Sequence, residues 1–298
     1  MTSNLTMKKI AKELGVSVST VSRALKNHPR IGAQTTEKVQ NLAKELHYQP
    51  NIRAINFKNK KSFNVGVVLP YLTEQFFSIA LSGIEETLMR KGYSMVVMQS
   101  KNDYEREAAA IESLIRHGVD GILISLASET YNKSHFHNVF HHVPFVFFDR
   151  VMKHPRYSSV YGNITRVACE AMDHLVKNGY QKIALMNGPN SLQGTEERLN
   201  GYLDGLKAHG LAINPKYIKN INLSQEDTEL KINELLDLPE RPDVILAFND
   251  YIALDAMQVC KNRGLKINQD IRFVTFSNLS FCSYLENPPI LTVEQFPS

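Results

Sequence analysis

Apolar residues recur with two different spacings along this chain, and the spacing changes near residue 63. Before that point, apolar side chains stand three and four positions apart, as at Ile10, Ala11 and Leu14. This spacing places them on one face of a helix. After that point, short and mostly apolar runs alternate with longer stretches of helical spacing. We therefore predict a small helical unit followed by a larger α/β region.

The amino-terminal unit is predicted to contain three helices. The first ends at Gly15, because glycine tolerates the left-handed backbone of a tight turn. The second begins at Ser17, whose hydroxyl can cap it, and buries Val21. The third is amphipathic and ends before Pro50. Its inner positions are Val39, Leu42, Ala43 and Leu46. Two short helices that meet at a glycine turn and precede a third are typical of a helix-turn-helix, which lays its second helix in the major groove of DNA.

Positive charge is concentrated in the same unit. Residues 1–62 contain twelve Lys and Arg against three acidic residues, a net charge of +9, whereas the whole chain has +4. The remaining residues therefore contain 22 basic against 27 acidic side chains, a net charge of −5. Because a basic surface gains affinity for a phosphate backbone by releasing condensed counterions, this asymmetry indicates a nucleic-acid partner. A helical bundle whose Ser and Thr residues serve only as caps is the alternative, and it leaves the charge unexplained.

The exposed face of the second predicted helix provides the expected DNA contacts. The guanidinium of Arg23 can bond O6 and N7 of one guanine together, and Val18 can touch a thymine methyl group. The hydroxyl and amide side chains around them suit phosphate oxygens, and Thr6 is also available to cap the first helix. The residues of this unit expected to contact DNA are Thr6, Ser17, Val18, Ser19, Thr20, Ser22, Arg23 and Asn27.

Composition excludes several classes of protein. No apolar run reaches the roughly 18 residues that a membrane span needs. The first residues, MTSNLTMKKIAKELG, lack the apolar core of a secretion signal. Cys169, Cys260 and Cys282 are far apart and show no metal-binding or disulfide spacing. We therefore expect a cytoplasmic protein with no membrane association.

The region from residue 63 onward is predicted to form two parallel sheets. The expected strands are 65–69, 94–98, 121–125 and 145–149 in a first series, and 183–187, 217–222, 244–248 and 272–276 in a second. The helices expected between them are 77–91, 105–117, 166–178, 196–209 and 251–263. Apolar strands separated by helices indicate parallel sheets covered on both faces. Two such series predict two doubly wound lobes, with a ligand held between them at the carboxyl ends of the strands.

Polar and aromatic side chains follow the ends of those strands and form the predicted ligand site. The candidates are Phe76, Phe77, Asp149, Arg150, Arg198, Asn249, Ser277 and Gln295. Aromatic rings stack on the CH face of a sugar, and one charged or amide group can form two hydrogen bonds to the sugar's hydroxyls. A purine effector stays open, because aromatic and Arg side chains also suit nucleobases. Alternative roles also stay open, in which Phe76 and Phe77 are core aromatics, the Arg residues form surface ion pairs and Asn249 only caps a helix.

Two motifs that could indicate other chemistry are set aside. The loop 188–195 follows a strand as a phosphate loop does, but its spacing is one residue too long and no Lys precedes Thr195. His137 and His141 fall on one helical face without a nearby acid or cysteine that would complete a metal site. There is also no nucleophile elbow. We expect no catalytic residue, no metal ion and no cofactor.

The run GVSVSTVSRALKNHPRIG, followed by a third helix and then YQPN, resembles the lactose/galactose repressor family of bacterial transcription regulators. The resemblance extends over the large region and implies that its lobes share the periplasmic sugar-binding fold. It also implies that residues 51–57 form a hinge helix that folds on DNA and begins at Asn51. Phe57 stands where the family usually has Leu and would be an apolar wedge in the minor groove. Ala54 matches a small residue that lets paired hinge helices approach closely.

The resemblance also supports the ligand site. Seven of the candidates, all except Ser277, match the family's ligand motif, and the set is similar to that of periplasmic pentose-binding proteins. Ser277 stands where both groups usually have Asp, and Glu74 is a possible replacement carboxylate. The family usually continues past Gln295 with another helix and strand, so we expect dimerisation weaker than that of a chain with this segment.

The resulting hypothesis is a ligand-responsive transcription regulator. Its expected domains are a DNA-binding headpiece at 1–50, a hinge helix and linker at 51–62, and a two-lobed effector domain at 63–298. We expect a homodimer that binds a pseudo-palindromic double-stranded DNA operator, a monosaccharide effector, and repression of a carbohydrate-use operon. The alternatives are a sugar-binding module without regulation and an α/β enzyme.

Phe57→Ala is predicted to weaken operator binding and to leave effector affinity unchanged, because only the minor-groove wedge is lost. Operator titration and effector calorimetry on the same preparation measure both affinities. An equal loss of both would indicate a folding defect in place of a lost wedge.

Overall fold

The computed structural model describes residues 6–48, 61–127, 136, 142–152 and 156–294. The chain folds as two compact units, residues 1–62 and residues 63–298. The predicted hinge segment 51–57 and Gln295 lie outside the described residues. In the described part of the chain, no helix is both long enough and apolar enough to span a membrane.

The described residues of the first unit form three helices, as predicted, with bounds α1 Met7–Glu13, α2 Val18–Ala24 and α3 Ala33–Glu45. Ile10, Val21 and Val39 are fully buried where the three helices meet. Gly15 adopts a left-handed φ of 61° between α1 and α2. The Ser17 hydroxyl accepts the backbone N–H of Thr20 at 3.1 Å and so caps α2. The side chain of Thr6, expected to cap α1, makes no capping hydrogen bond.

The second unit contains two five-stranded parallel sheets, one in each lobe, which confirms the predicted fold class. The first lobe has the strand order β2-β1-β3-β4-β5 and the second β7-β6-β8-β9-β10. The strands of the first lobe are β1 Asn64–Leu69, β2 Ser94–Gln99, β3 Gly121–Ile124, β4 Phe145–Phe148 and β5 Ser158–Val160. Those of the second are β6 Ile183–Asn187, β7 Ile218–Asn220, β8 Val244–Ala247, β9 Arg272–Phe276 and β10 Leu291–Val293. The two sheets therefore repeat one topology.

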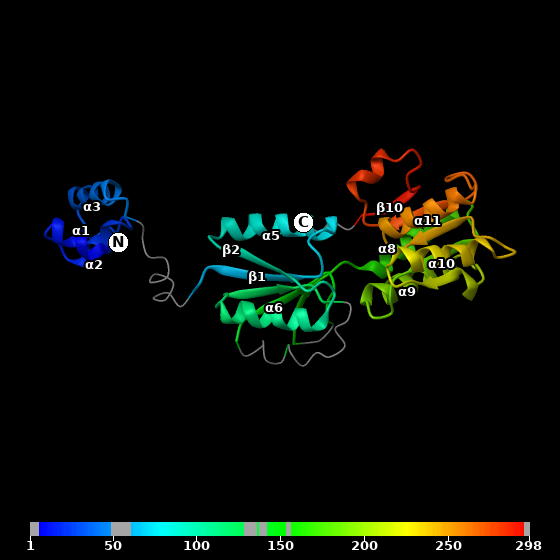
Figure 1. Ribbon diagram of the computed structural model, residues 1–298, viewed down its shortest axis with the longest axis horizontal. Helices are drawn as coiled ribbons and strands as arrows, with labels where there is room; N and C mark the ends of the chain where they lie inside the picture. Colours follow the sequence, from blue (N-terminus) through cyan, green and yellow to red (C-terminus); the bar gives the residue numbers. More distant parts are fainter. Residues whose placement is uncertain (1–5, 49–60, 128–135, 137–141, 153–155, 295–298) are drawn as a thin grey trace. The chain divides into compact units, whose positions relative to one another are not determined.

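Helices cover both faces of each sheet, which explains the nearly continuous apolar character of the central strands. Their bounds are α5 Gln75–Arg90, α6 Tyr104–Arg116, α8 Ile164–Lys177, α9 Gln193–Ala208, α10 Gln225–Leu236 and α11 Asp250–Asn262. In the first lobe, α5 and α6 lie on opposite faces of the sheet (Figure 1). In the second lobe, α8 and α9 share one apolar core, and α10 and α11 form another on the other face.

Several elements were not predicted from the sequence. Helix α10 has a weak apolar stripe, because acidic and polar residues occupy most of QEDTELKINELL. Strands β5 and β10 have three residues each and lie at sheet edges, so neither shows a clear apolar run. The predicted strand 217–222 is in fact a 3₁₀ turn over Pro215–Tyr217 followed by the short β7.

Helices α8 and α9 approach each other closely because α9 presents two glycines to α8. A Cβ added at Gly201 would stand 2.5 Å from the Cβ of Ala168 and would also meet the carbonyl of Thr165. A Cβ at Gly205 would meet the side chain of Met172. This contact fixes the position of α9, which contains the candidate residue Arg198.

Gly201→Ala is therefore predicted to lower the free energy of unfolding by about 1–3 kcal/mol, because the overpacking outweighs the better helix propensity of Ala. Chemical denaturation measures the difference. Gly162→Ala is the matched control, since an added Cβ there meets no atom within 4 Å. Equal stability of the two variants would contradict the close-packing argument.

Candidate functional site: a cavity between the two lobes

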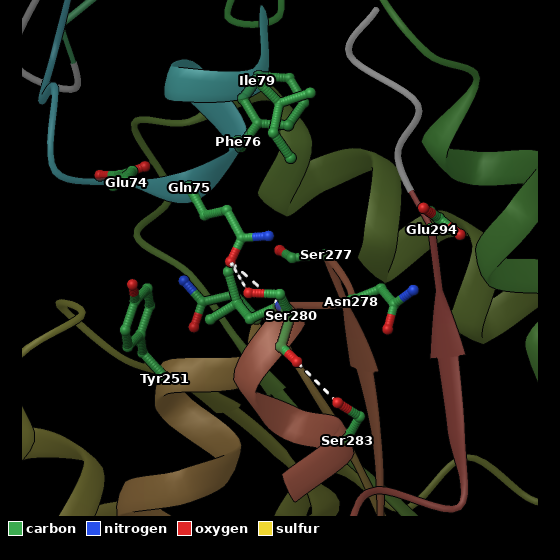
Figure 2. A pocket seen from close by; sticks show the side chains of 12 residues that line it. Glu74, Gln75, Phe76, Ile79, Tyr251, Ser277, Asn278, Ser280, Ser283 and Glu294 are labelled. Atoms are coloured by element: carbon green, nitrogen blue, oxygen red, sulfur yellow. Dashed lines mark hydrogen bonds between the residues drawn. The ribbon is translucent and has the colours of Figure 1, made fainter.

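A cavity of about 410 Å³ opens between the lobes at the carboxyl ends of β1, β8 and β9. Its lining residues are Glu74, Gln75, Phe76, Ile79, Asn249, Tyr251, Ser277, Asn278, Leu279, Ser280, Ser283 and Glu294. Figure 2 shows the first lobe's Gln75, Phe76 and Ile79 facing side chains of the second lobe. Strand order reverses between β1 and β3 in one sheet and between β6 and β8 in the other, and ligands of such sheets bind outside these switch points.

Three of the eight predicted ligand residues line this cavity: Phe76, Asn249 and Ser277. The amide oxygen of Asn249 accepts the backbone N–H of Ile252 at 3.0 Å, so this residue both caps α11 and faces the cavity. Phe77 is only 1% exposed and packs edge-on against Phe76 and Phe148, as a core aromatic does. The remaining charged candidates Asp149, Arg150 and Arg198 are not among the lining residues, and they form the groups described next.

Arg150 connects two carboxylates of the first lobe. One guanidinium nitrogen lies 3.9 Å from the carboxylate of Glu74, and another lies 3.9 Å from that of Asp149. The third nitrogen donates a hydrogen bond to Asn102 Oδ1 at 2.6 Å. Burial raises the pKa of Asp149, and the charges of Arg150 and Arg198 oppose that rise. Burial also raises the pKa of Glu74, again opposed by Arg150. Glu74 lines the cavity, so a carboxylate is present there although position 277 is Ser.

Arg198 lies buried between two aromatic rings of the second lobe. Its guanidinium carbon is 4.1 Å from the ring centre of Phe248 and 4.6 Å from that of Phe276, and the residue is 6% exposed. One terminal nitrogen donates to the carbonyl of Gly194 at 3.0 Å, whereas the buried Nε has no hydrogen-bond partner among the described residues. Burial lowers the pKa of Arg198 to about 10, against the opposing effect of the Asp149 carboxylate. A buried cation with an unused donor is the group that a hydroxyl-rich or carbonyl-containing ligand would satisfy.

The loop that follows β9 is held in place by a buried carboxylate. Asp250 is fully buried, accepts the hydroxyl of Thr275 and accepts the backbone N–H of Leu279 at 2.8 Å. Between these two anchor points, Ser277 and Asn278 have positive φ angles of 129° and 60°. This strained backbone persists because both ends of the loop are fixed.

Nine lining residues were not among the predicted candidates. Glu74 is predicted only as a replacement carboxylate. Gln75, Tyr251 and Asn278 lie next to or two positions from predicted candidates, so their closeness in sequence could have identified them. Leu279 belongs to the loop after β9, and Ser280 and Ser283 belong to the 3₁₀ helix Ser280–Tyr284. No apolar periodicity in the sequence predicts this segment. Ile79 comes from the second turn of α5, and Glu294 follows the unpredicted strand β10.

The candidate DNA face of the first unit is accessible. Val18 is 39% exposed and Arg23 is exposed, while Ser22 and Thr20 are half-buried. The Ser17 hydroxyl bonds those of Ser19 and Thr20 at 2.7 and 2.9 Å. Thr6 is exposed as well.

Asn27 follows α2 with a positive φ of 52°, and its amide oxygen accepts from Gln40 of α3 at 2.7 Å. This bond ties the end of the second helix to the third. The amide oxygen of Asn27 therefore has a structural partner besides the phosphate contact expected of this residue.

Other sequence expectations fall outside the described residues or stand apart from the cavity. Asn51, Ala54, Phe57 and Gln295 lie outside the described residues, as do His137 and His141. Within the described ranges, no three His, Cys, Asp or Glu side chains gather as a metal site would require. Gly188, at the start of the set-aside loop, packs against Phe248, whose ring a Cβ would approach to 2.5 Å.

The folds and the cavity define a two-lobed ligand-binding protein joined to a helix-turn-helix unit. Residues 62–298 match the model of periplasmic binding proteins and sugar-binding domains of the LacI family, and residues 6–51 match that of bacterial regulatory proteins of the lacI family. The chain therefore belongs to the LacI family of bacterial regulatory proteins.

Individual relatives agree with this membership. The chain is 28% identical to the HTH-type transcriptional repressor CytR of Escherichia coli K12, over 97% of this chain and 84% of that protein. It is 28% identical to the HTH-type transcriptional repressor PurR of Vibrio campbellii, over 97% of this chain and 86% of that protein. The structure of the Lac repressor dimer bound to operator and the anti-inducer ONPF superposes with a TM-score of 0.84 and 28% identity, covering 98% and 88% of the two chains.

Arg198→Met is predicted to lower effector affinity roughly 10- to 100-fold, the usual range for losing a hydrogen bond to a charged group. The free energy of unfolding should stay unchanged or rise by about 1 kcal/mol, because Met fills the space between the rings without a buried charge. Calorimetry and thermal unfolding measure the two quantities.

Arg272→Met is the matched control for this substitution. Arg272 stacks on Tyr180 at 5.4 Å and begins β9, at the opposite end of the strand from Phe276. A large loss of stability in Arg198→Met, with no such loss in the control, would show that Arg198 is needed for folding rather than for binding.

Proposed function

We propose that this chain is a repressor of a carbohydrate-use operon that binds a pseudo-palindromic operator as a homodimer. In this proposal a monosaccharide held between the two lobes changes the affinity for the operator. The supporting observation is the coexistence of a basic helix-turn-helix unit and a polar cavity between two lobes in one chain of the LacI family.

The DNA-binding part of the proposal is supported by charge and by exposure. The net charge of +9 in residues 1–62 matches a polyanionic partner. Arg23 stands exposed in the last turn of α2, the helix that would enter the major groove. Its planar fork suits a guanine edge, and the hydroxyls at the start of the same helix suit phosphate oxygens.

A sugar is favoured as the effector by the chemistry of the cavity lining. Most lining side chains bear hydroxyl, amide or carboxylate groups, which suit a ligand with many hydroxyls. Phe76 provides an aromatic face. Arg198 packs on Phe248 and Phe276, which directly precede the lining residues Asn249 and Ser277, and its Nε is an unused donor among the described residues. A cavity of about 410 Å³ lies at the small end of the roughly 300–1,000 Å³ range of ligand pockets, as a monosaccharide requires.

A purine effector is the alternative. A planar base would stack on Phe76 or on the ring of Tyr251, which also lines the cavity. The carboxylates of Glu74 and Glu294 would accept the exocyclic amino group of such a base. We rank a purine below a sugar, because the three serines in the lining suit the hydroxyls of a sugar better than the face of a base.

The homodimer is supported by exposed aromatic residues of the second lobe. Tyr284 is 88% exposed, and Phe281 stands beside Tyr251, with ring centres 6.2 Å apart. Exposed aromatic clusters of this kind are enriched in protein interfaces. A two-fold dimer would also match an operator with two half-sites.

Operator binding of the full chain to its own upstream DNA, titrated with salt and with candidate effectors, tests the proposal. We expect affinity to fall steeply with salt and to change when a monosaccharide is added. Arg23→Ala should cost roughly 1–3 kcal/mol of operator affinity and relax the preference at one base pair. Unchanged affinity in this variant would contradict the assignment of α2 to the groove. A response to purines with none to monosaccharides would replace the sugar by the alternative effector.

A further inference from the structure

One side chain of the first lobe joins the second lobe across the cavity. The Oε1 atom of Gln75 accepts the backbone N–H of Ser280 at 3.1 Å and its hydroxyl at 3.2 Å, although the two residues are 205 positions apart in the sequence. Both residues line the cavity, and Figure 2 shows the two bonds as dashed lines that meet at the Gln75 oxygen. The contact therefore closes one side of the space in which the proposed effector would lie.

Both partners are held by rigid structure on their own side. Gln75 is the first residue of α5, a helix of 16 residues that packs on the sheet of the first lobe. Ser280 is the first residue of the 3₁₀ helix Ser280–Tyr284, and the Ser283 hydroxyl donates to its carbonyl at 2.9 Å.

Asp250 anchors the loop one residue earlier, since its buried carboxylate accepts the N–H of Leu279 at 2.8 Å. Two successive N–H groups are therefore bound by side chains of opposite lobes, Leu279 by the second lobe and Ser280 by the first. Because the backbone is anchored on both sides, the Gln75 bonds can form only when the lobes are close together, although rotation of the Gln75 side chain alone can break them.

The contact is weak enough to be reversible. The atoms at this position are exposed to solvent, and one hydrogen bond of this kind shifts an equilibrium by about two- to tenfold. A contact of that size changes the balance between open and closed lobes without locking either state.

We propose that Gln75 and Ser280 form an inter-lobe clasp that favours the closed arrangement of the lobes before any effector binds. Gln75 is thus a positioning residue, because it raises the fraction of chains in which both halves of the cavity face each other. The apparent affinity for a ligand scales with that fraction. The effect on effector affinity depends on the proposed function, whereas the clasp itself does not.

Hydrogen exchange at Ser280 in the effector-free full chain tests the clasp directly. In Gln75→Leu the Ser280 amide should lose its protection, while the Leu279 amide, held by Asp250, stays protected. Gln75→Glu keeps an acceptor oxygen at the start of a helix, where negative charge is favourable, and should retain the protection. Gln225→Leu is the matched control, because Gln225 is likewise the first residue of a helix and its side chain, among the described residues, donates to Glu229 of its own helix. Equal protection of Ser280 in Gln75→Leu and in the unmodified chain would overturn the proposal.

Ser280→Pro removes both donors from the other side with little backbone strain. Proline is well tolerated at the first position of a helix, and Leu279, with φ −63° and ψ 135°, already has the conformation that a following proline requires. This variant also covers the case in which Gln75→Leu does not fold.

Effector affinity of the two single variants and the double variant then tests the coupling. We expect each single variant to bind the effector roughly two- to tenfold more weakly, and the double variant to bind no more weakly than either, because all three lose the same bonds. Additive losses would mean that each side chain contacts the effector separately, which would refute the coupling. If no monosaccharide or purine binds even the unmodified chain, the proposed function fails while the exchange result still decides the clasp.

Discussion

The parallel register of the two sheets is the constraint on which the rest of the large unit depends. In a parallel sheet all carboxyl ends lie at one edge, so the loops that follow β8 and β9 lie together in the second lobe, and residues that follow β1 in the first lobe line the same cavity. Every strand pairing in the described residues is parallel, and the two lobes repeat one strand order. The cavity lining therefore comes from four separate parts of the chain, each placed by the sheet it follows.

Two charged groups of the lobes are incompletely satisfied by the rest of the protein that the structure describes. Arg198 has an unused donor between two rings, and burial disfavours the charged form of Asp149. Replacing all members of a buried ionic group together by well-packed apolar side chains is often neutral or stabilising. Asp250 is the contrasting case, because its fully buried carboxylate has two donors and fixes the strained loop at Ser277. Asp250 thus has its hydrogen-bond donors within the protein, whereas the Nε donor of Arg198 has no acceptor among the described residues.

The first unit separates its core residues from the residues expected to contact DNA. Its core is apolar and small, with Ile10, Val21 and Val39 fully buried. The residues expected to contact DNA are exposed or half-buried on α2 and its flanks. Asn27 differs, since it bonds Gln40 and so helps to hold α2 against α3. A recognition helix must be presented rigidly, and this bond contributes to that.

The sequence by itself determined the three-helix unit, the charge asymmetry, the doubly wound fold class and the family, because these depend on local periodicity, on composition and on a contiguous motif. Among its ligand candidates are Phe76, Asn249 and Ser277, which line the cavity and which each follow an apolar strand. Only the tertiary structure decided that Phe77 packs in the core, that Arg198 lies between Phe248 and Phe276, and that Gln75 reaches Ser280. These facts depend on which way a side chain points and on contacts between residues far apart in the chain. Short edge strands and a 3₁₀ turn give no periodic signal, so β10 and the residues from Leu279 to Ser283 became visible only when the sheet and its loops were assembled.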